Sequence, residues 1–165
     1  MYNLEILQNP YASEDLEAIR AINQENIPEV SDIESIERLK QLIEWSSYLL
    51  VVRSSEIAGF IILMRENQEY ESLNYDFFNK QDDPFLYVDR IAIQEKHQRK
   101  GLGKLIYNKV IELGEELDVN IACEVNTLPR NDPSLAFHAG FGFKEVGTKD
   151  YDDHSVVYLT KFLHS

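Results

Sequence analysis

The sequence has little cysteine, few basic residues and no long apolar run. Its single cysteine, Cys123, cannot form an internal disulfide bond, which favours a protein of the reducing cytoplasm. The N-terminal segment MYNLEILQNPYASED lacks the basic start and the apolar centre of a signal peptide. No stretch approaches the roughly 20 apolar residues that a membrane-spanning helix needs. We therefore expect a cytoplasmic protein without a membrane segment.

The shortage of basic residues also limits the partners. The chain has 29 acidic against 16 basic residues and a formal net charge of -13. This charge repels phosphate backbones and removes the main source of non-specific affinity for nucleic acids, so we expect no nucleic-acid partner. The acidity is compatible with a plain solubility feature or with a field that attracts a cationic substrate.

The apolar pattern predicts one domain over residues 1–165 with an α/β fold. Alternating or continuous apolar runs predict strands, and apolar residues at helical spacing predict helices. The polar segment 67–83 holds four aromatic residues, so we expect an ordered excursion there. The predicted order is a strand at 3–9, helices from Ser13 and Ser31, strands at 47–54, 57–66 and 84–93, a helix at 102–117, a strand at 119–126, a short helix from 131, and strands at 143–151 and 155–163.

Side chains that can cap a helix predict where three of these helices begin. Ser13 is the candidate N-cap of the first helix, and Ser31 with Glu34 has the spacing of a capping box. Asp132 is the candidate cap of the short helix, with Pro133 at its first position.

The stretch HQRKGLGKL at residues 97–105 gathers positive charge and flexible backbone in an acidic chain. Because Gly101 and Gly103 lie between a predicted strand and a helix, they allow an anion to approach backbone N–H groups. The alternative is a tight turn whose basic residues are simply solvated. The basic residues are Arg99, Lys100 and Lys104.

Two specific phosphate motifs are excluded at this loop. A Walker loop needs glycine where Gln98 stands and Ser or Thr where Leu105 stands. A dinucleotide-binding fingerprint needs a small residue at the position of Ile106.

The run Gln98-Arg99-Lys100-Gly101-Leu102-Gly103 resembles the Q/R-x-x-G-x-G/A signature of the GNAT N-acetyltransferase superfamily. The segment CEVN, followed by NDPSLAFHAGFGFKEVG, resembles the second signature of that family, and residues 1–65 fit its N-terminal half. The excursion with NYDFF and the strand LYVDRIAI resemble an uncharacterised bacterial subgroup. The resemblance implies a mixed central sheet of about six to seven strands flanked by about four helices.

The resemblance also implies acetyl-coenzyme A as the acetyl donor. In the family, backbone groups of the central strand pair with the pantetheine arm, and N–H groups of the glycine loop hold the pyrophosphate. A backbone N–H at Ile91 is the implied oxyanion donor. The implied cofactor-binding residues are Ile91, Ala92, Ile93, Gln98, Arg99, Lys100, Gly101, Leu102, Gly103, Lys104, Asn131 and Phe137.

Two carboxylates are candidates for the general base. Strand alternation places Glu124 and Asn126 on one face of their strand, and a carboxylate in an apolar strand is costly unless it is paired or used. Glu124 also aligns with a glutamate that serves as the base in some protein-acetylating relatives. In the central strand, alternation places Asp89 on one face with Tyr87, Ile91 and Ile93, unless a bulge intervenes. The alternative is that Asp89 or Glu124 forms a salt bridge with Arg90 or Arg53.

His138 is the candidate general acid. The family usually has tyrosine after the aromatic residue in F-Y-x-x-x-G-F, and His138 stands at that position. An imidazolium can protonate a departing thiolate near neutral pH. This departure from the pattern leaves open whether a discrete acid is used, and a histidine that packs beside the cofactor is the alternative.

The aromatic residues of the excursion are candidates for binding the acceptor. Aromatic faces and carboxylates suit an amine with an apolar portion. The alternative is a lid or a dimer contact that packs its own aromatic residues. The candidate acceptor-binding residues are Tyr70, Tyr75, Phe77, Phe78 and Asn126.

The sequence thus predicts an N-acetyltransferase that transfers an acetyl group from acetyl-coenzyme A to a primary amine by direct attack. The acceptor is a small molecule or a peptide, and a homodimer is compatible with the sequence. A catalytically silent acyl-coenzyme A binding module is the alternative, favoured if neither carboxylate faces the cleft. A structural interaction protein is a third hypothesis. No metal site is expected, because His97, His154 and His164 lack metal-ligand spacing.

Overall fold

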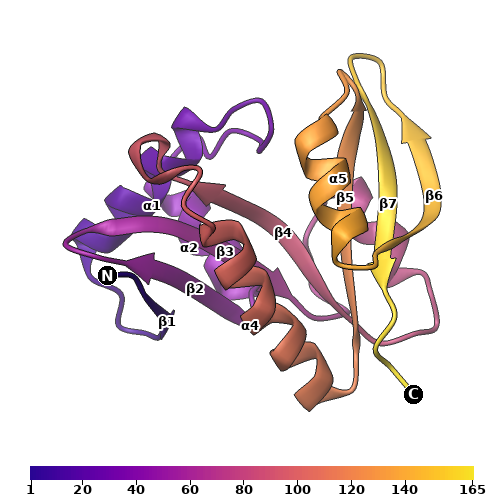
Figure 1. The fold of residues 1–165 in the computed structure, drawn as a ribbon, viewed down its shortest axis with the longest axis horizontal. Coiled ribbons are helices and arrows are strands. Elements are labelled where there is room, and N and C mark those ends of the chain that lie inside the picture. Colours follow the sequence, from indigo (N-terminus) through magenta and orange to yellow (C-terminus); the bar gives the residue numbers. More distant parts are fainter.

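In the computed structural model, which describes residues 1–165, seven strands form one mixed sheet in the order β1-β2-β3-β4-β5-β7-β6 (Figure 1). Only β4 and β5 run parallel; every other neighbouring pair is antiparallel. The predicted mixed sheet is therefore confirmed. The strands are β1 (Asn3–Leu7), β2 (Tyr48–Arg53), β3 (Ile57–Met64), β4 (Phe85–Ile93), β5 (Asn120–Leu128), β6 (Lys144–Asp150) and β7 (Ser155–Lys161).

Helices cover both faces of the sheet. The helices α1 (Ser13–Glu25), α2 (Ile36–Trp45) and α3 (Leu73–Asn79) pack on one face, and α4 (Leu102–Leu117) and α5 (Asp132–Gly140) pack on the other. The additional helix beyond the four expected is α3, which lies in the excursion between β3 and β4. A short 3-10 turn, η1 (Glu95–His97), precedes the glycine loop. None of the helices is long and apolar enough to cross a membrane.

The core explains this layering. Apolar residues of α1 and α2 recur at helical spacing and pack against alternate residues of β2 and β3. The opposite residues of the same strands pack against α4, including Ile106 and Val110. Strand β3 is buried along its whole length because it lies between these two layers.

The helix starts differ from the predicted ones. Ser13 is the first residue of α1 and makes no capping hydrogen bond. Helix α2 begins five residues after Ser31, with Ser35 as N-cap: the Ser35 hydroxyl accepts from the backbone N–H of Arg38 at 3.0 Å. Asn131, rather than Asp132, caps α5. Several neighbouring residues could cap each helix, and the tertiary position of the helix decides which one does.

Aromatic stacking packs α3 against the β6–β7 hairpin. The Phe77 ring stacks on Tyr158 with centroids 4.0 Å apart and planes inclined by 12°. Gly147 of β6 makes room for this contact, because a Cβ atom there would lie 2.8 Å from Phe77 Cζ. The excursion is thus fixed to strands more than 60 residues further along the chain.

Gly147→Val tests this contact. The added side chain must displace Phe77, so we expect the free energy of unfolding to fall by about 1–3 kcal/mol in chemical denaturation. Gly140→Ala is the matched control, because no atom lies within 4 Å of a Cβ at that position. Equal stabilities of the two variants would contradict the proposed contribution of the Phe77–Tyr158 stack to stability.

Candidate active site

The site begins where β4 and β5 separate. The two parallel strands pair only from Phe85 to Tyr87, opposite Asn120 to Ala122. Beyond these residues β4 stays paired with β3 and β5 with β7, and the two strands diverge (Figure 1). The divergence leaves backbone groups of β4 without a strand partner on the side of the gap.

Backbone direction decides which groups of β4 face this gap. The Gln94 N–H donates to the Ala58 carbonyl of β3 at 2.7 Å. Because successive residues of a strand direct their N–H and C=O groups to opposite sides, Ala92 also faces β3, whereas Ile91 and Ile93 face the gap. Ala92 is therefore not placed to pair with a pantetheine arm, which corrects that expectation. The Ile93 carbonyl already accepts from the side chains of Asn26 and Gln98, at 3.1 and 3.2 Å.

A β-bulge at Asp89 overturns the predicted strand faces. Ile62 lies opposite Arg90 while Leu63 lies opposite Val88, so Asp89 is the extra residue of β4. Tyr87 packs with the α1–α2 layer, whereas the partly buried Ile91 and Ile93 pack with the α4 layer. The prediction that Tyr87, Asp89, Ile91 and Ile93 share one face is wrong.

The glycine loop has the backbone that an anion site requires. Arg99 and Gly101 have positive φ angles of 63° and 76°. Gly101 is the N-cap of α4 and offers no side-chain cap, so the first N–H groups of the helix, from Leu102 to Lys104, stay available. The first backbone bond of the helix runs from Leu105 N–H to the Gly101 carbonyl at 3.1 Å.

Positive charge surrounds these N–H groups. Neighbouring Lys96 pairs with Glu56 at 2.7 Å, but the three bases of the loop form no ion pair. Free cations and free helix N–H groups fit a ligand that carries several phosphate charges, as coenzyme A does. The three exposed bases are Arg99, Lys100 and Lys104.

Two further predicted cofactor residues lie beside this loop. The Phe137 ring lies 3.6 Å from the place of a Cβ on Gly103, so α5 packs against the first turn of α4 beside the loop. The Asn131 side chain accepts from the backbone N–H of Ser134 at 3.3 Å, and the backbone N–H of Asn131 donates to the Asn126 carbonyl. Asn126 and Asn131 both line the cleft described next.

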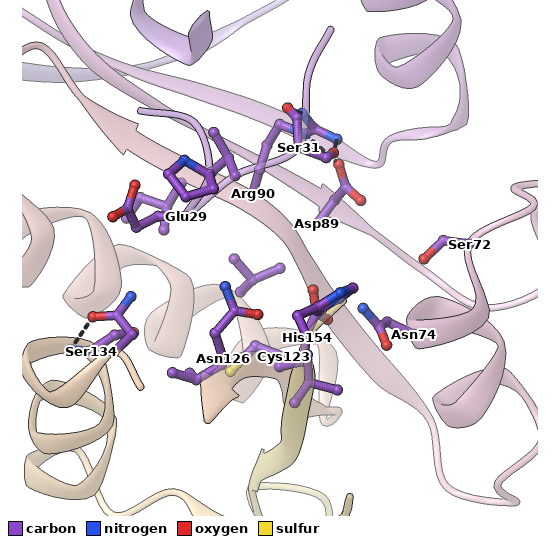
Figure 2. A pocket seen from close by; sticks show the side chains of 18 of the residues that line it. Glu29, Ser31, Ser72, Asn74, Asp89, Arg90, Cys123, Asn126, Ser134 and His154 are labelled. Carbon is purple, nitrogen blue, oxygen red and sulfur yellow. Dashed lines mark hydrogen bonds and ion pairs between the residues drawn. The ribbon is translucent and has the colours of Figure 1, made fainter. Parts of the chain in front are cut away.

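A cleft of about 660 Å³ extends from the gap between β4 and β5. Its walls are the α1–α2 loop, the start of α3, the β6–β7 turn and the start of α5. Figure 2 shows Glu29 and Ser31 on one wall, Ser72 and Asn74 on another, and Asn126 between them.

Glu124 lies in this cleft and is partly exposed to it. The Tyr87 hydroxyl donates to Glu124 Oε1 at 2.5 Å, and no lysine or arginine forms a salt bridge with the carboxyl. Burial raises the pKa of Glu124 to about 8, although the hydrogen bond from Tyr87 acts to lower it. With a pKa of about 8, the ionised fraction of this carboxyl group grows as pH rises past neutrality, and the ionised form can accept a proton.

Asp89 is held quite differently, although it lines the same cleft. Its Oδ1 accepts from the Tyr70 hydroxyl at 2.6 Å, and its Oδ2 accepts from Arg90 Nε at 2.8 Å. The Asp89 side chain is only 3% exposed. Both oxygens are thus occupied by protein donors, and the carboxylate is the counter-ion of a buried arginine.

Arg90 uses its remaining nitrogens to hold the α1–α2 loop. Nη1 donates to the Asn23 side chain at 3.1 Å and to the Ser31 carbonyl at 2.9 Å. Nη2 donates to the Ser31 hydroxyl at 3.0 Å. The hydroxyl that was expected to cap a helix therefore connects this loop to β4.

His138 is buried and both of its ring nitrogens have protein partners. Nδ1 lies 2.7 Å from the Ser134 carbonyl, which can only accept, so Nδ1 carries the proton. Nε2 lies 2.7 Å from the Tyr107 hydroxyl and accepts from it in the neutral ring. Burial lowers the pKa of His138, which disfavours the imidazolium. We therefore correct the assignment of His138 as general acid: it links α5 to α4.

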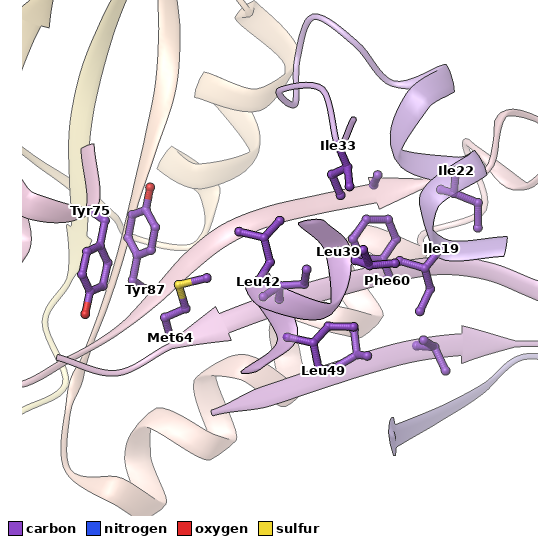
Figure 3. Close-up of a cluster of buried hydrophobic side chains, with 14 of the residues drawn as sticks. Ile19, Ile22, Ile33, Leu39, Leu42, Leu49, Phe60, Met64, Tyr75 and Tyr87 are labelled. Carbon is purple, nitrogen blue, oxygen red and sulfur yellow. The ribbon is translucent and has the colours of Figure 1, made fainter. Parts of the chain in front are cut away.

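The aromatic residues of the excursion mostly face away from the cleft. Tyr75 and Phe78 are 1% and 3% exposed and belong to the core, where Tyr75 lies beside Tyr87 (Figure 3). Phe77 is stacked on Tyr158. Of the four predicted acceptor residues on this segment only Tyr70 lines the cleft, so the assignment of the other three is corrected. Their apolar rings are needed to bury α3.

Sequence reasoning missed two residues that contact or approach Glu124. Tyr87 pairs with Ala122, two residues before Glu124, so the register of the parallel pair was the signal that could have identified it. Asn74 lies in the excursion, where no pattern indicates a role.

Comparisons with known proteins agree on one family. The model described as "Acetyltransferase (GNAT) family" matches residues 16–143. The ribosomal-protein-S18-alanine N-acetyltransferase of Escherichia coli is similar over 100% of this chain and 96% of its own, with 17% identity and a TM-score of 0.73. Arabidopsis thaliana NAA60, solved with acetyl-CoA, is 16% identical over 99% of both chains, with a TM-score of 0.74. An N-acetyltransferase from Staphylococcus aureus Mu50 is 16% identical over 99% of both chains, with a TM-score of 0.71.

Glu124→Gln should change how stability depends on pH. The pKa of Glu124 is raised from 4.5 to about 8, so between these values the folded protein keeps a proton that the unfolded chain has lost. The parent therefore loses stability as pH rises through this window, and glutamine does not. We expect the Tm of Glu124→Gln, relative to the parent, to rise by at least about 3 °C between pH 5 and pH 8 in thermal denaturation. A constant Tm difference would contradict the raised pKa.

Proposed function

Because the chain belongs to the acetyltransferase (GNAT) family, we propose that its cleft transfers an acetyl group from acetyl-coenzyme A to a primary amine by direct attack. The observation that carries the proposal is the position of Glu124. It is a carboxyl group without a cationic partner, in the cleft that opens from the diverging strands. A base at this position can prepare an amine for attack.

The residues of the glycine loop fit the phosphates of the cofactor. The N–H groups from Leu102 to Lys104 and the free bases around them would hold the pyrophosphate. Ile91 directs its backbone groups into the gap and would pair with the pantetheine arm. The bound cofactor supplies an activated thioester carbonyl.

Two groups of this chain would then act on the reacting atoms. Glu124, directly or through a water molecule, accepts the proton of the acceptor ammonium and leaves a neutral nucleophile. The Ile91 N–H donates to the oxygen on which negative charge develops, and such a preorganised donor contributes about 3–4 kcal/mol. The C–S bond of the thioester then breaks, and the departing thiolate takes its proton from the attacking nitrogen or from water.

The charges of the cleft favour an acceptor without a carboxylate. Arg38 pairs with Glu71, Arg90 with Asp89, and His154 with Asp153. Glu29 and Glu124 remain without a cationic partner, so no positive side chain is left to bind an anionic group. The proposed acceptor is therefore a small-molecule or peptide amine whose other charges, if any, are positive.

The silent binding module is the weaker candidate. That alternative is favoured if neither carboxylate faces the cleft, and Glu124 lines it. A cytoplasmic location belongs to the same proposal and rests on the single buried cysteine, Cys123.

Gly101→Val tests the cofactor loop. Gly101 has a φ of +76°, where a β-branched residue is strained, although open space surrounds the position. The loop should change shape, and we expect the Kd for acetyl-coenzyme A in calorimetry to rise at least about tenfold. Gly140→Ala should bind as the parent does. Unchanged affinity of Gly101→Val would refute the loop assignment.

Turnover with a panel of amines tests the reaction itself. Steady-state release of coenzyme A is measured with monoamines, diamines, amino acids and short peptides as acceptors. Amines without a carboxylate should give the higher kcat/KM. Cofactor binding without turnover on any acceptor would favour the silent module instead.

Glu124→Gln then tests the assignment of the base. We expect kcat/KM for the best acceptor to fall by about a hundredfold to ten-thousandfold, with cofactor affinity nearly intact. The rise of activity with pH through a pKa near 8 should disappear. Asp89→Asn is the control for the second carboxylate: its activity should still rise with pH, but with a lower midpoint, because the charge of Asp89 helps to raise the pKa of Glu124. If the rise of activity with pH were lost in Asp89→Asn and retained in Glu124→Gln, Asp89 rather than Glu124 would be the base.

A further inference from the structure

We propose that Asn74, at the start of α3, is a positioning residue for Glu124. In this arrangement the amide oxygen is held by two tyrosines of the β6–β7 hairpin, and the amide nitrogen is left free in the cleft that Glu124 also lines. The inference rests on the proposed function, in which Glu124 is the base. It gives the α3 excursion a role in the reaction.

Two hydroxyl groups fix the orientation of the Asn74 amide. The Tyr151 hydroxyl donates to Asn74 Oδ1 at 2.6 Å, and the Tyr158 hydroxyl donates to the same oxygen at 2.9 Å. Both hydroxyl protons are thus directed to the amide oxygen, which has two lone pairs to accept them. The NH₂ group must therefore point away from the two tyrosines.

One of the two tyrosines that hold the Asn74 oxygen lies next to Glu124 in the sheet. Tyr158 of β7 is directly opposite Glu124 of β5, and side chains so paired lie on the same face. Asn74 also lines the cleft, as Figure 2 shows. The NH₂ group is thereby placed to donate to the Glu124 carboxyl, and such a bond favours the charged form and lowers the pKa of that group, as the Tyr87 hydroxyl does.

The backbone that carries Asn74 is fixed as well. Ser72 caps α3, and its hydroxyl accepts from Tyr75 N–H at 3.2 Å. At the other end of the helix, Phe77 stacks on Tyr158, the residue that also binds the Asn74 oxygen. Side chain and backbone of Asn74 are thus held by the same hairpin.

Several groups near Glu124 already have other partners and do not compete with the Asn74 amide. Asp89 and Arg90 neutralise each other, and Cys123 and Tyr107 lie on the α4 side of β5. Tyr151 and Tyr158 direct their hydroxyl protons to Asn74. The titratable or charged groups near Glu124 and along this part of the cleft are Tyr70, Tyr87, Asp89, Arg90, Tyr107, Cys123, Tyr151, His154 and Tyr158.

Asn74→Asp is the informative variant. Aspartate keeps an oxygen for both tyrosines, so the packing of α3 is preserved, but it replaces the amide donor with a carboxylate beside Glu124. A lost donor and an added negative charge both raise the pKa of Glu124. Asn79→Asp is the matched control: it makes the same change on the same helix and keeps the oxygen that accepts from Asn67 N–H at 2.7 Å.

The experiment measures kcat and KM against pH with the best amine, and follows the carboxyl carbon of Glu124 by NMR in each variant. In Asn74→Asp we expect the acid-limb pKa of kcat/KM and the NMR pKa to rise together by about one unit or more, with a fall in kcat/KM at pH 7 of about tenfold. KM for the amine should change less than kcat. Asn79→Asp should match the parent.

Two results overturn the proposal, and both differ from a failure of the proposed function. An unchanged NMR pKa in folded Asn74→Asp shows that the amide does not act on Glu124, even if the parent proves inactive with every amine. A rise in KM alone shows that Asn74 binds the acceptor instead. The absence of parental turnover refutes the proposed function only, because the NMR titration needs no activity.

Discussion

The structure depends on the early separation of two parallel strands. The pair β4–β5 is joined over only three residues of each strand and then opens, while the outer neighbours β3 and β7 keep each strand in place. An open seam in a central sheet is costly for a protein, because its backbone groups have no partner. Here the seam exposes Ile91 to a ligand, brings the glycine loop to one end and Glu124 to one side. The divergence of β4 and β5 thus places both the proposed cofactor loop and the proposed base.

The cleft contains one carboxyl group that is paired with a cation and one that is not. A buried arginine needs a counter-ion, and Asp89 supplies it. Glu124 has only neutral donors around it, so desolvation dominates and its charged form is disfavoured. The two acids near the opening between β4 and β5 are thus held differently, because Asp89 contacts a guanidinium group and Glu124 does not.

The parts of this molecule that could be predicted from sequence depend on local chemistry. The glycine loop and the mixed sheet follow from residue type and spacing, which need no tertiary information. The bulge at Asp89 could not be predicted, because it is a mismatch between β4 and its partner strand. The proposed role of α3 in orienting Glu124 could not be predicted either. The two residues that bind the Asn74 oxygen, Tyr151 and Tyr158, lie 77 and 84 positions further along the chain than Asn74. His138 stands at a family position, but its burial and its partners Tyr107 and Ser134 depend on how α4 and α5 pack together.

The fastening of the α1–α2 loop has a consequence for recognition. Arg90 holds Ser31 from the bulge of β4, and Asn26 donates to the Ile93 carbonyl from the same loop. This wall of the cleft is preorganised, so an incoming amine does not have to order a flexible segment before it can bind. A rigid wall also cannot remodel itself around a misfit. Discrimination between acceptors then comes from the shape and charge that the wall has before the acceptor binds. A change of specificity that moves this wall would have to break the hydrogen bonds between Arg90 and Ser31.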